Sequence, residues 1–271
     1  MKIGSLFSGI GGIELGFEKV GGFETKWFVE KEPYCQAILK KHWPKVPIYK
    51  DITKVNFKEI EQVDIITGGF PCQDISNAGQ RKGIGGERSG LWKEFWRAIG
   101  EIQPRYAFVE NVSALTYRGL LTVLGDLAEI GYNAEWHCLA ARQVGALHKR
   151  ERIFIIAHPN NNGVLGQKRK EKQRWRMQTK PNDILIADHW GKRVQRFREK
   201  SLSGKQGLSW CKDVRRLEDL QGRQDIPEPL FRGGRDEVPC WMDRIKSIGN
   251  AVVPQCAEFF AEIIKEKEAR K

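Results

Sequence analysis

A cysteine that could act as a nucleophile follows a proline in the first third of the chain. Cys72 comes after the run Asp64-Ile-Ile-Thr-Gly-Gly-Phe-Pro71, which begins as a short apolar strand and breaks at two glycines. Pro71 fixes its own φ and pushes Phe70 towards an extended conformation, so Cys72 is expected on a restricted path at the strand end. A single cysteine in a soluble protein is more often an inert, packed side chain than a nucleophile. The residues around Cys72 must therefore show whether it has a catalytic role.

A glutamate and two arginines are candidates to share a pocket with Cys72. Glu110 ends an apolar run, and partial burial there would raise its pKa and favour the protonated form near neutral pH. Cys72 and Glu110 are both expected at carboxyl ends of parallel strands, the side on which such sheets bind ligands. Arg150 and Arg152 lie two positions apart, hence on one face if a strand has begun there. The alternatives are a capping or loop acid and ordinary surface charge.

The segment that follows Cys72 is rich in glycines and cations. Gly79-Gln-Arg-Lys-Gly-Ile-Gly-Gly-Glu-Arg-Ser-Gly90 shows no apolar period, which predicts a mobile basic loop. A candidate nucleophile followed by a movable loop that attracts phosphates suggests chemistry on a polyanion.

A glycine-rich turn near the amino terminus predicts a cofactor site. Phe7-Ser-Gly-Ile-Gly-Gly12 joins the first predicted strand to a helix, where backbone can approach a ligand and the helix N-terminus favours negative charge. Glu30 ends the second strand, a position where an acid accepts hydrogen bonds from ribose hydroxyls. Asp51 follows the third strand and could accept from an adenine amino group. Each acid alone is more often a solvated loop carboxylate, and the turn alone also fits a dinucleotide oxidoreductase.

The elements that must position these residues alternate between short apolar runs and helical patterns. This alternation predicts an α/β fold with a doubly wound, mostly parallel sheet. The expected strands are Lys2–Phe7, Thr25–Val29, Val46–Tyr49, Val63–Thr67 and Arg105–Glu110, and the expected helices are Gly12–Lys19, Pro33–His42, Leu91–Ile102 and Gly119–Ile130. Two further strands, Asn133–Ala141 and Arg152–Ala157, joined by a short loop, would form an antiparallel hairpin at one sheet edge.

The charge of the chain is strongly positive. Its 271 residues include 46 Lys and Arg against 34 Asp and Glu, a net charge of +12, which suits an anionic partner such as nucleic acid or an acidic membrane surface. Most of the excess falls in residues 159–241, which fit either a solvated insert or a nucleic-acid surface. We expect a catalytic and cofactor-binding domain over 1–158, a small basic region over 159–241, and a return segment over 242–271 with an amphipathic helix that ends at about Lys265.

The cysteines and the apolar runs indicate the cellular compartment. The six cysteines are widely spaced and form no cluster of metal-ligand spacing, which predicts no metal, no disulfide framework and a reducing compartment. No apolar run approaches the ~20 residues of a membrane span, and the amino terminus lacks a signal-peptide core. We expect a soluble, cytoplasmic, monomeric protein with no membrane partner.

Taken in their order along the chain, the motifs resemble those of the cytosine-C5 DNA methyltransferases. The matching stretches are Phe7-Ser-Gly-Ile-Gly-Gly12, the acids Glu30 and Asp51, Gly69-Phe-Pro-Cys-Gln73, Glu110-Asn-Val112, His148-x-Arg-x-Arg152 and Gly249-Asn-Ala-Val-Val-Pro254. The resemblance implies S-adenosylmethionine as cofactor, double-stranded DNA as partner, a flipped-out cytosine at a specific site as substrate, and residues 159–241 as a target-recognition region. It also implies a bacterial, archaeal or phage-encoded protein, with a possible cognate restriction endonuclease.

The resemblance also assigns roles to single residues. Cys72, as thiolate, would add to C6 of cytosine, and protonated Glu110 would hydrogen-bond N3, so that C5 can take the methyl group. Arg152, with Arg150 as second choice, would steer the base and lower the pKa of Cys72, and Gln73 belongs to the same catalytic group. The cofactor site would be formed by Phe7, Gly9, Ile10, Gly11, Gly12, Glu30, Lys31, Asp51, Ile52, Pro71, Leu91, Asn250, Ala251 and Val252. The DNA contacts would come from Gln80, Arg81, Lys82, Arg88, Arg174, Arg176 and Arg193.

Three features depart from the family pattern. Ser5 stands where an acid is common, and His148 where glutamine is common. The basic region is short, and its Leu220-Gln-Gly222 is not followed by Phe-Pro, so no target sequence can be transferred. Methylation of RNA, a non-catalytic DNA-binding relative and a dinucleotide oxidoreductase are the alternatives.

Overall fold

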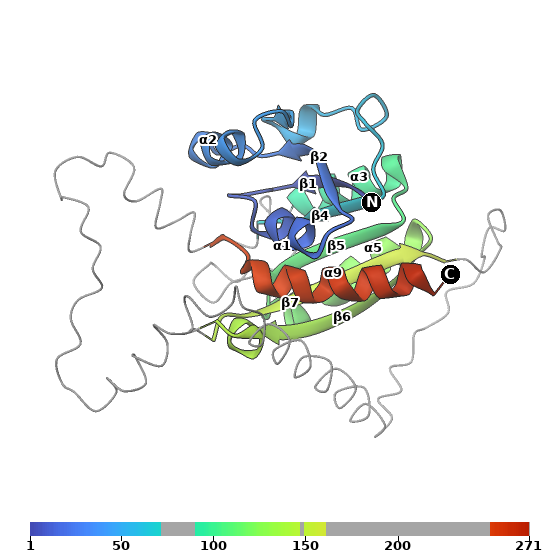
Figure 1. Ribbon diagram of the computed structural model, residues 1–271. Coiled ribbons are helices and arrows are strands. Elements are labelled where there is room, and N and C mark those ends of the chain that lie inside the picture. Colours follow the sequence, from blue (N-terminus) through green and yellow to red (C-terminus); the bar gives the residue numbers. More distant parts are fainter. Residues whose placement is uncertain (72–89, 147–148, 161–249, 271) are drawn as a thin grey trace, which may run out of the picture.

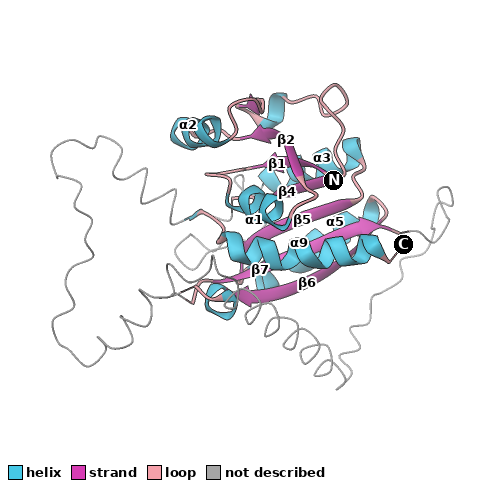
Figure 2. Cartoon of the chain, viewed as in Figure 1, coloured by secondary structure: helices cyan, strands magenta, loops and turns pink. Residues whose placement is uncertain are grey.

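The computed structural model describes residues 1–71, 90–146, 149–160 and 250–270. These residues form a seven-stranded sheet with helices on both faces, as Figures 1 and 2 show. The strands are β1 (Lys2–Leu6), β2 (Glu24–Val29), β3 (Ile48–Tyr49), β4 (Ile65–Gly68), β5 (Tyr106–Val112), β6 (Tyr132–Ala140) and β7 (Glu151–Pro159). The helices are α1 (Gly12–Val20), α2 (Pro33–His42), α3 (Gly90–Ile102), α4 (Leu115–Arg118), α5 (Leu120–Glu129) and α9 (Pro254–Ala269), with short 3-10 turns η1 (Ile52–Lys54) and η4 (Ala141–Val144).

The strand order is β3-β2-β1-β4-β5-β7-β6. The neighbours from β3 to β5 pair in parallel, and β7 runs antiparallel between β5 and β6. The predicted doubly wound, mostly parallel sheet and the antiparallel hairpin at its edge are therefore confirmed. The connection of this hairpin, from Ala141 to Arg150, has the length that the predicted strand ends imply and contains η4.

Most predicted element ends differ from the observed ones by one or two residues, and two of the differences have a clear physical cause. The third strand starts at Ile48 rather than Val46, because Pro47 has no N–H group to donate to a ladder. Its carbonyl still accepts a bond from Phe28 N at 3.0 Å. The last helix continues beyond Lys265 to Ala269, where the side chains of residues 265–268 are charged and solvent can satisfy them.

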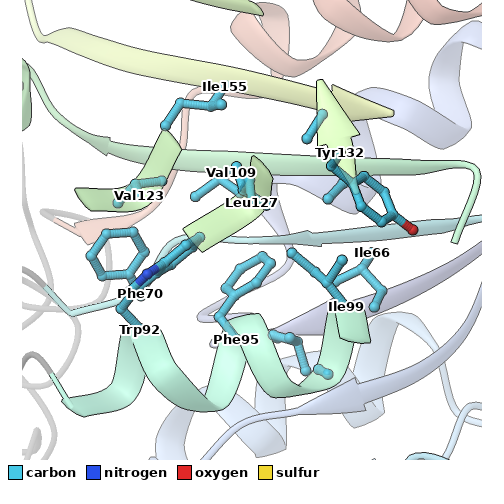
Figure 3. Packing of buried hydrophobic residues seen from close by; sticks show 14 of the residues in the cluster. Ile66, Phe70, Trp92, Phe95, Ile99, Val109, Val123, Leu127, Tyr132 and Ile155 are labelled. Carbon is cyan, nitrogen blue, oxygen red and sulfur yellow. The ribbon is translucent and has the colours of Figure 1, made fainter. Parts of the chain in front are cut away.

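Two apolar layers hold the helices on the sheet. Successive residues of a strand point to opposite faces, so Val109 and Phe108 of β5 belong to different layers. One layer packs α3 and α5 against the sheet and buries Trp92 and Phe95 completely or nearly so (Figure 3). The other layer packs α1 and α9 on the opposite face, where Phe260 contacts Phe108 with ring centroids 5.6 Å apart.

Close contact between α1 and α9 brings the last described segment to the amino-terminal turn. A Cβ on Gly12 would lie 2.3 Å from the carbonyl oxygen of Val252, and one on Gly16 would lie 2.4 Å from that of Pro254. Only glycine at both positions lets the two backbones approach this closely. No helix among these residues is long and apolar enough to cross a membrane.

Candidate active site

A cavity of about 600 Å³ lies at the carboxyl ends of β1, β2, β3, β4 and β5. Its volume is within the range of cofactor and small-molecule sites. The residues predicted from sequence that line it are Phe7, Gly9, Gly12, Glu30, Lys31, Asp51, Ile52, Pro71, Leu91, Glu110, Arg152, Asn250, Ala251 and Val252. The fold thus gathers residues from both ends of the described chain around one space. Ile10, Gly11 and Arg150 are not among the lining residues.

The glycine-rich turn is held by the acid that follows β2. Oε2 of Glu30 accepts a hydrogen bond from Gly9 N at 2.6 Å, and its Oε1 accepts from Glu32 N at 2.8 Å. Phe7 and Gly9 both have positive φ, 52° and 56°, which for Phe7 is an uncommon conformation. Strained backbone of this kind is typical of functional sites. Burial raises the pKa of Glu30, while the backbone hydrogen bonds oppose that rise.

Another part of the cavity wall is formed by the turn after β3. Oδ1 of Asp51 accepts hydrogen bonds from Thr53 N at 3.1 Å and from Thr53 Oγ1 at 2.7 Å, which caps η1. These bonds lower the pKa of Asp51. Ile52 lies next to it, almost completely buried, and Leu91 of α3 adds an apolar surface. This wall therefore combines a carboxylate with apolar side chains.

The path of the chain after β4 is fixed up to Pro71. Phe70 is buried in the layer beneath α3 and lies against Trp92 with ring centroids 5.2 Å apart (Figure 3). Nδ2 of Asn111, itself buried, donates to the carbonyl oxygen of Phe70 at 3.1 Å. Pro71, the next residue, lines the cavity. The position after Pro71 in the sequence is that of Cys72.

A buried acid faces an arginine where the cavity meets β5 and β7. Glu110 is 8% exposed, and Nε of Arg152 lies 3.1 Å from its Oε1. Burial raises the pKa of Glu110 to about 7, although the charges of Arg152 and Arg150 and the bond from Arg152 oppose this. The expectation of a desolvated acid with a raised pKa is thus met in the structure. At neutral pH such a carboxyl group can both donate and accept a proton.

The two arginines are not equivalent. Strand β7 begins at Glu151, so Arg150 precedes the strand and has a φ of 26°. The condition under which Arg150 and Arg152 would share a face, a strand that includes both, is therefore not met, because strand alternation starts only after Arg150. Both charges still act on Glu110, but only Arg152 lines the cavity. The preference for Arg152 agrees with this geometry.

Sequence reasoning missed several lining residues. Asn111 is part of the recognised Glu-Asn-Val motif, yet its bond to the Phe70 carbonyl links the end of β5 to the loop after β4. Tyr34 and Cys35 line the cavity from the first turn of α2, and no pattern in the sequence separated them from ordinary core residues. Gly69 also lines the cavity. It lies so close to Glu110 that an added Cβ would be 2.6 Å from Oε2 of that residue.

Several predicted residues lie outside the part of the chain that the structure describes. They are Cys72, Gln73, Gln80, Arg81, Lys82, Arg88, Arg174, Arg176 and Arg193, together with residues 161–249 of the predicted recognition and return segments. Within the described ranges, no group of three or more His, Cys, Asp or Glu side chains is arranged to hold a metal ion.

The sheet order and the cavity at its carboxyl edge define an α/β methyltransferase fold. The solved structure of the Entamoeba histolytica methyltransferase EhMeth shares this fold, with a TM-score of 0.51, 19% sequence identity, and coverage of 64% of this chain and 57% of that chain. The C-5 cytosine-specific DNA methylase family model matches residues 1–224, and the chain belongs to this family.

Two curated relatives support this assignment. The Type II methyltransferase M2.BsuMI of Bacillus subtilis (strain 168) is 37% identical over 165 residues, which cover 58% of this chain and 42% of the relative. The Type II methyltransferase M.Bsp6I of Bacillus sp. (strain RFL6) is 34% identical over 166 residues, which cover 59% of this chain and 53% of the relative. The chain thus matches about half the length of these relatives.

Proposed function

We propose that the protein transfers a methyl group from S-adenosylmethionine to C5 of a flipped-out cytosine at a specific site in double-stranded DNA. The observation that carries this proposal is the continuity of one cavity. It runs from the acids Glu30 and Asp51 to the pair of Glu110 and Arg152, and Pro71, the residue before Cys72, lies on its wall. A cofactor and a base held in this space would meet beside a proton donor.

The residues of the cavity suit S-adenosylmethionine. Glu30 is a buried acceptor placed for ribose hydroxyls, while Phe7, Ile52 and Leu91 supply apolar surface for an adenine ring. Asp51 offers an acceptor to the adenine amino group. When bound, S-adenosylmethionine supplies an electrophilic methyl group. The chain does not need a metal for this chemistry.

Cys72 and Glu110 act together on the cytosine ring. The Cys72 thiolate adds to C6, and Glu110 gives its proton to N3, so the electron pair of the C5–C6 double bond becomes available at C5. C5 would then take the methyl group, leaving the cofactor as the neutral thioether S-adenosylhomocysteine. Loss of the C5 proton to a base and expulsion of the Cys72 thiolate restore the double bond, and N3 returns its proton to Glu110. The pKa of Glu110, about 7, suits both directions of this transfer.

Arg152 orients Glu110 and provides positive charge beside the reacting ring. Its Nε bonds to Oε1 of Glu110, which leaves the far oxygen of the carboxyl group for the base. Gln73 follows Cys72 in the sequence and belongs to the same group of residues. A base inside a duplex cannot reach such a cavity, so the cytosine must be flipped out.

The basic segments provide the contacts to DNA in this proposal. Residues 159–241, with Arg174, Arg176 and Arg193, form the target-recognition region, and Gln80, Arg81, Lys82 and Arg88 contact the flipped nucleotide and its phosphates. Residues 1–158 and 242–271 form the catalytic unit. Because the relatives are named Type II methyltransferases, a cognate restriction endonuclease is a further proposed partner.

Bisulfite sequencing of DNA from cells that express the chain tests this function. We expect protected cytosines in one sequence context, and none with Cys72→Ser. Cys138→Ser, a change of another free cysteine in β6 away from the cavity, is the matched control and should keep the activity. A duplex that contains 5-fluorocytosine should form a covalent adduct with the wild type in the presence of cofactor. Methylation of RNA but not DNA, or full activity of Cys72→Ser, would refute the proposal.

A further inference from the structure

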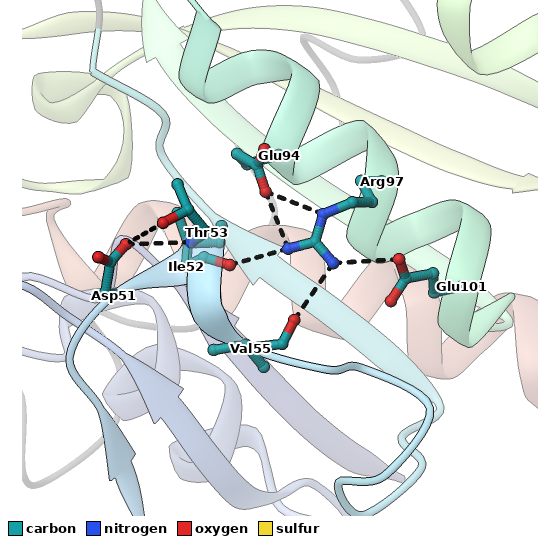
Figure 4. Close-up of polar contacts among 7 residues, drawn as sticks. All are labelled: Asp51, Ile52, Thr53, Val55, Glu94, Arg97 and Glu101. Carbon is teal, nitrogen blue, oxygen red and sulfur yellow. Dashed lines mark hydrogen bonds and ion pairs between the residues drawn. The ribbon is translucent and has the colours of Figure 1, made fainter.

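Arg97 of α3 joins two walls of the cavity without lining it. Its Nη2 donates to the carbonyl oxygen of Ile52 at 2.8 Å, and its Nη1 donates to that of Val55 at 3.2 Å (Figure 4). These carbonyl groups lie at the two ends of η1, the turn that Asp51 caps. The guanidinium group thus ties the turn after β3 to a helix that is more than forty positions later in the sequence.

Two acids on α3 hold the guanidinium group in place. Nε donates to Oε2 of Glu94 at 2.9 Å, and Nη1 donates to Oε1 of Glu101 at 3.0 Å. The plane of Arg97 also lies over the ring of Phe57, 4.9 Å from its centroid. Only the planar fork of an arginine can reach two carbonyls and two carboxylates at once, whereas an ammonium group is a point charge. Figure 4 shows one acid and one carbonyl at each terminal nitrogen, Glu94 and Ile52 at Nη2, and Glu101 and Val55 at Nη1.

The ion pairs alone do not explain this arrangement. The side chains of Arg97, Glu94 and Glu101 are each about a quarter exposed, and ion pairs between partly exposed side chains on one helix add little stability. The bonds that cross between elements are those to the carbonyls of Ile52 and Val55. Each is charge-assisted, hence stronger than a bond between neutral groups. The distinctive effect of Arg97 is therefore on the position of η1.

The position of η1 matters because both elements that Arg97 connects, η1 and α3, contribute residues to the cavity. Asp51 and Ile52 line it from the turn, and Leu91 lines it from the first helical turn of α3. A shift of η1 relative to α3 would change the distance between the acceptor of Asp51 and the apolar surface of Leu91. A displacement of about 1 Å is enough to impair a binding site of fixed geometry.

We propose that Arg97 is a positioning residue that sets the affinity for the adenosine end of the cofactor by fixing η1 against α3. This role rests on the proposed function, in which Asp51, Ile52 and Leu91 hold that end. It acts on binding of the cofactor and leaves binding of DNA and the chemical step at saturating cofactor unchanged.

Calorimetric titration with S-adenosylmethionine and assays at saturating cofactor test this role. For Arg97→Met we expect the Kd for S-adenosylmethionine to rise about tenfold or more, as loss of charge-assisted bonds predicts. The maximal rate and the KM for DNA should stay within about twofold of the wild type. Arg97→Lys should give an intermediate Kd. The matched control is Glu101→Gln, which removes the charge of one ion pair but keeps an amide oxygen that can accept from Nη1 and keeps both carbonyl bonds, so it should change the Kd less than about twofold.

The outcomes separate this role from the proposed function. A wild-type protein that binds no S-adenosylmethionine would overturn the function itself. Tight binding by the wild type and equally tight binding by Arg97→Met would overturn only the role of Arg97. An equal loss in Glu101→Gln, or a lower maximal rate with an unchanged Kd, would also overturn it. If circular dichroism shows that Arg97→Met is unfolded, the Kd values of Arg97→Lys and Glu101→Gln are compared instead. Equal Kd values for these two variants would contradict the positioning role of Arg97.

Discussion

Nε of Arg152 lies 3.1 Å from Oε1 of Glu110, between two neighbouring antiparallel strands at the rim of the cavity. Burial alone would hold the Glu110 carboxyl group in its neutral form over a wide pH range. The positive charge of Arg152 offsets part of this effect, and the resulting pKa is about 7. The pair therefore sets the proton affinity of the group that the proposed mechanism uses at N3 of the base.

The raised pKa of Glu110 predicts how activity depends on pH. The protonated form is active in the proposed mechanism, so kcat/KM for methyl transfer should fall as the pH rises through about 7. Glu110→Gln cannot give a proton to N3 and should lose about 10²- to 10⁴-fold in rate. Its residual activity should no longer show the decrease near pH 7. Rate measurements from pH 5.5 to 9 check this, and an unchanged decrease in Glu110→Gln would assign it to another group.

Replacement of Arg152 should shift the decrease in kcat/KM that follows the deprotonation of Glu110 to higher pH. Arg152→Ala removes a charge that lowers the pKa of Glu110, so the protonated form should persist to a higher pH than in the wild type. The rate below pH 7 should also fall roughly thirtyfold, because loss of a charge-assisted hydrogen bond of about 2 kcal/mol misplaces the acid. Arg152→Lys keeps the charge and should stay closer to the wild-type profile. A shift to lower pH in Arg152→Ala would contradict the electrostatic role.

The sheet and most of the cavity could be predicted because they depend on local patterns. Alternating apolar runs and helical segments specify a doubly wound sheet, and the parallel strands bring their carboxyl ends to one edge. Residues that follow these strands, such as Glu30, Asp51 and Glu110, therefore had to lie near one another. The confirmed features are those in which chain order alone determines position.

The features that sequence did not reveal depend on contacts between distant backbone groups. Arg97 bonds to the carbonyls of Ile52 and Val55, and every residue has a carbonyl group, so no pattern of side chains indicates such a clamp. The bond from Asn111 to the carbonyl of Phe70 could not be predicted either, because its acceptor is also a backbone carbonyl group. Whether the strand had begun at Arg150 stayed open, because the start of β7 depends on pairing with β5 and β6, which the local sequence does not specify.

The contact between α1 and the segment before α9 should be sensitive to a single methyl group. In Gly12→Ala the new Cβ would lie 2.3 Å from the carbonyl oxygen of Val252, so one of the two backbones must shift. Overpacking of this kind costs about 1 to 3 kcal/mol. Because Gly12 and Val252 both line the cavity, the Kd for S-adenosylmethionine should also rise, by roughly tenfold.

The control for this substitution is Gly100→Ala. Gly100 lies within α3, and beyond the adjacent backbone of its own helix no atom of the described residues comes within 4 Å of the position of an added Cβ. Alanine there should stabilise the protein by about 0.5 to 1 kcal/mol and leave the Kd unchanged. Thermal unfolding and calorimetric titration of both variants check the pair. A destabilised Gly100→Ala or an unaffected Gly12→Ala would show that the packing of these glycines has been misread.

A buried acid behind the active site should make the stability of the fold depend on pH. Glu14 of α1 is 1% exposed, its Oε1 accepts a hydrogen bond from Thr67 Oγ1 at 2.7 Å, and no hydrogen-bond partner for its Oε2 lies among the described residues. Burial raises the pKa of Glu14 above that of the unfolded chain. The folded state therefore binds more protons, and the stability from the neutral group is lost as the pH rises from about 4.5 towards the folded pKa.

Glu14→Gln removes this titration and keeps the shape of the side chain. From pH 5 to pH 8, the free energy of unfolding of Glu14→Gln should rise relative to that of the wild type by more than about 1 kcal/mol. Urea unfolding followed by circular dichroism measures this difference, in which contributions from other acids cancel. Glu59→Gln, a change of an exposed residue, is the control and should show no such trend. Parallel stability curves for Glu14→Gln and the wild type would mean that Glu14 keeps the same charge in the folded and unfolded states.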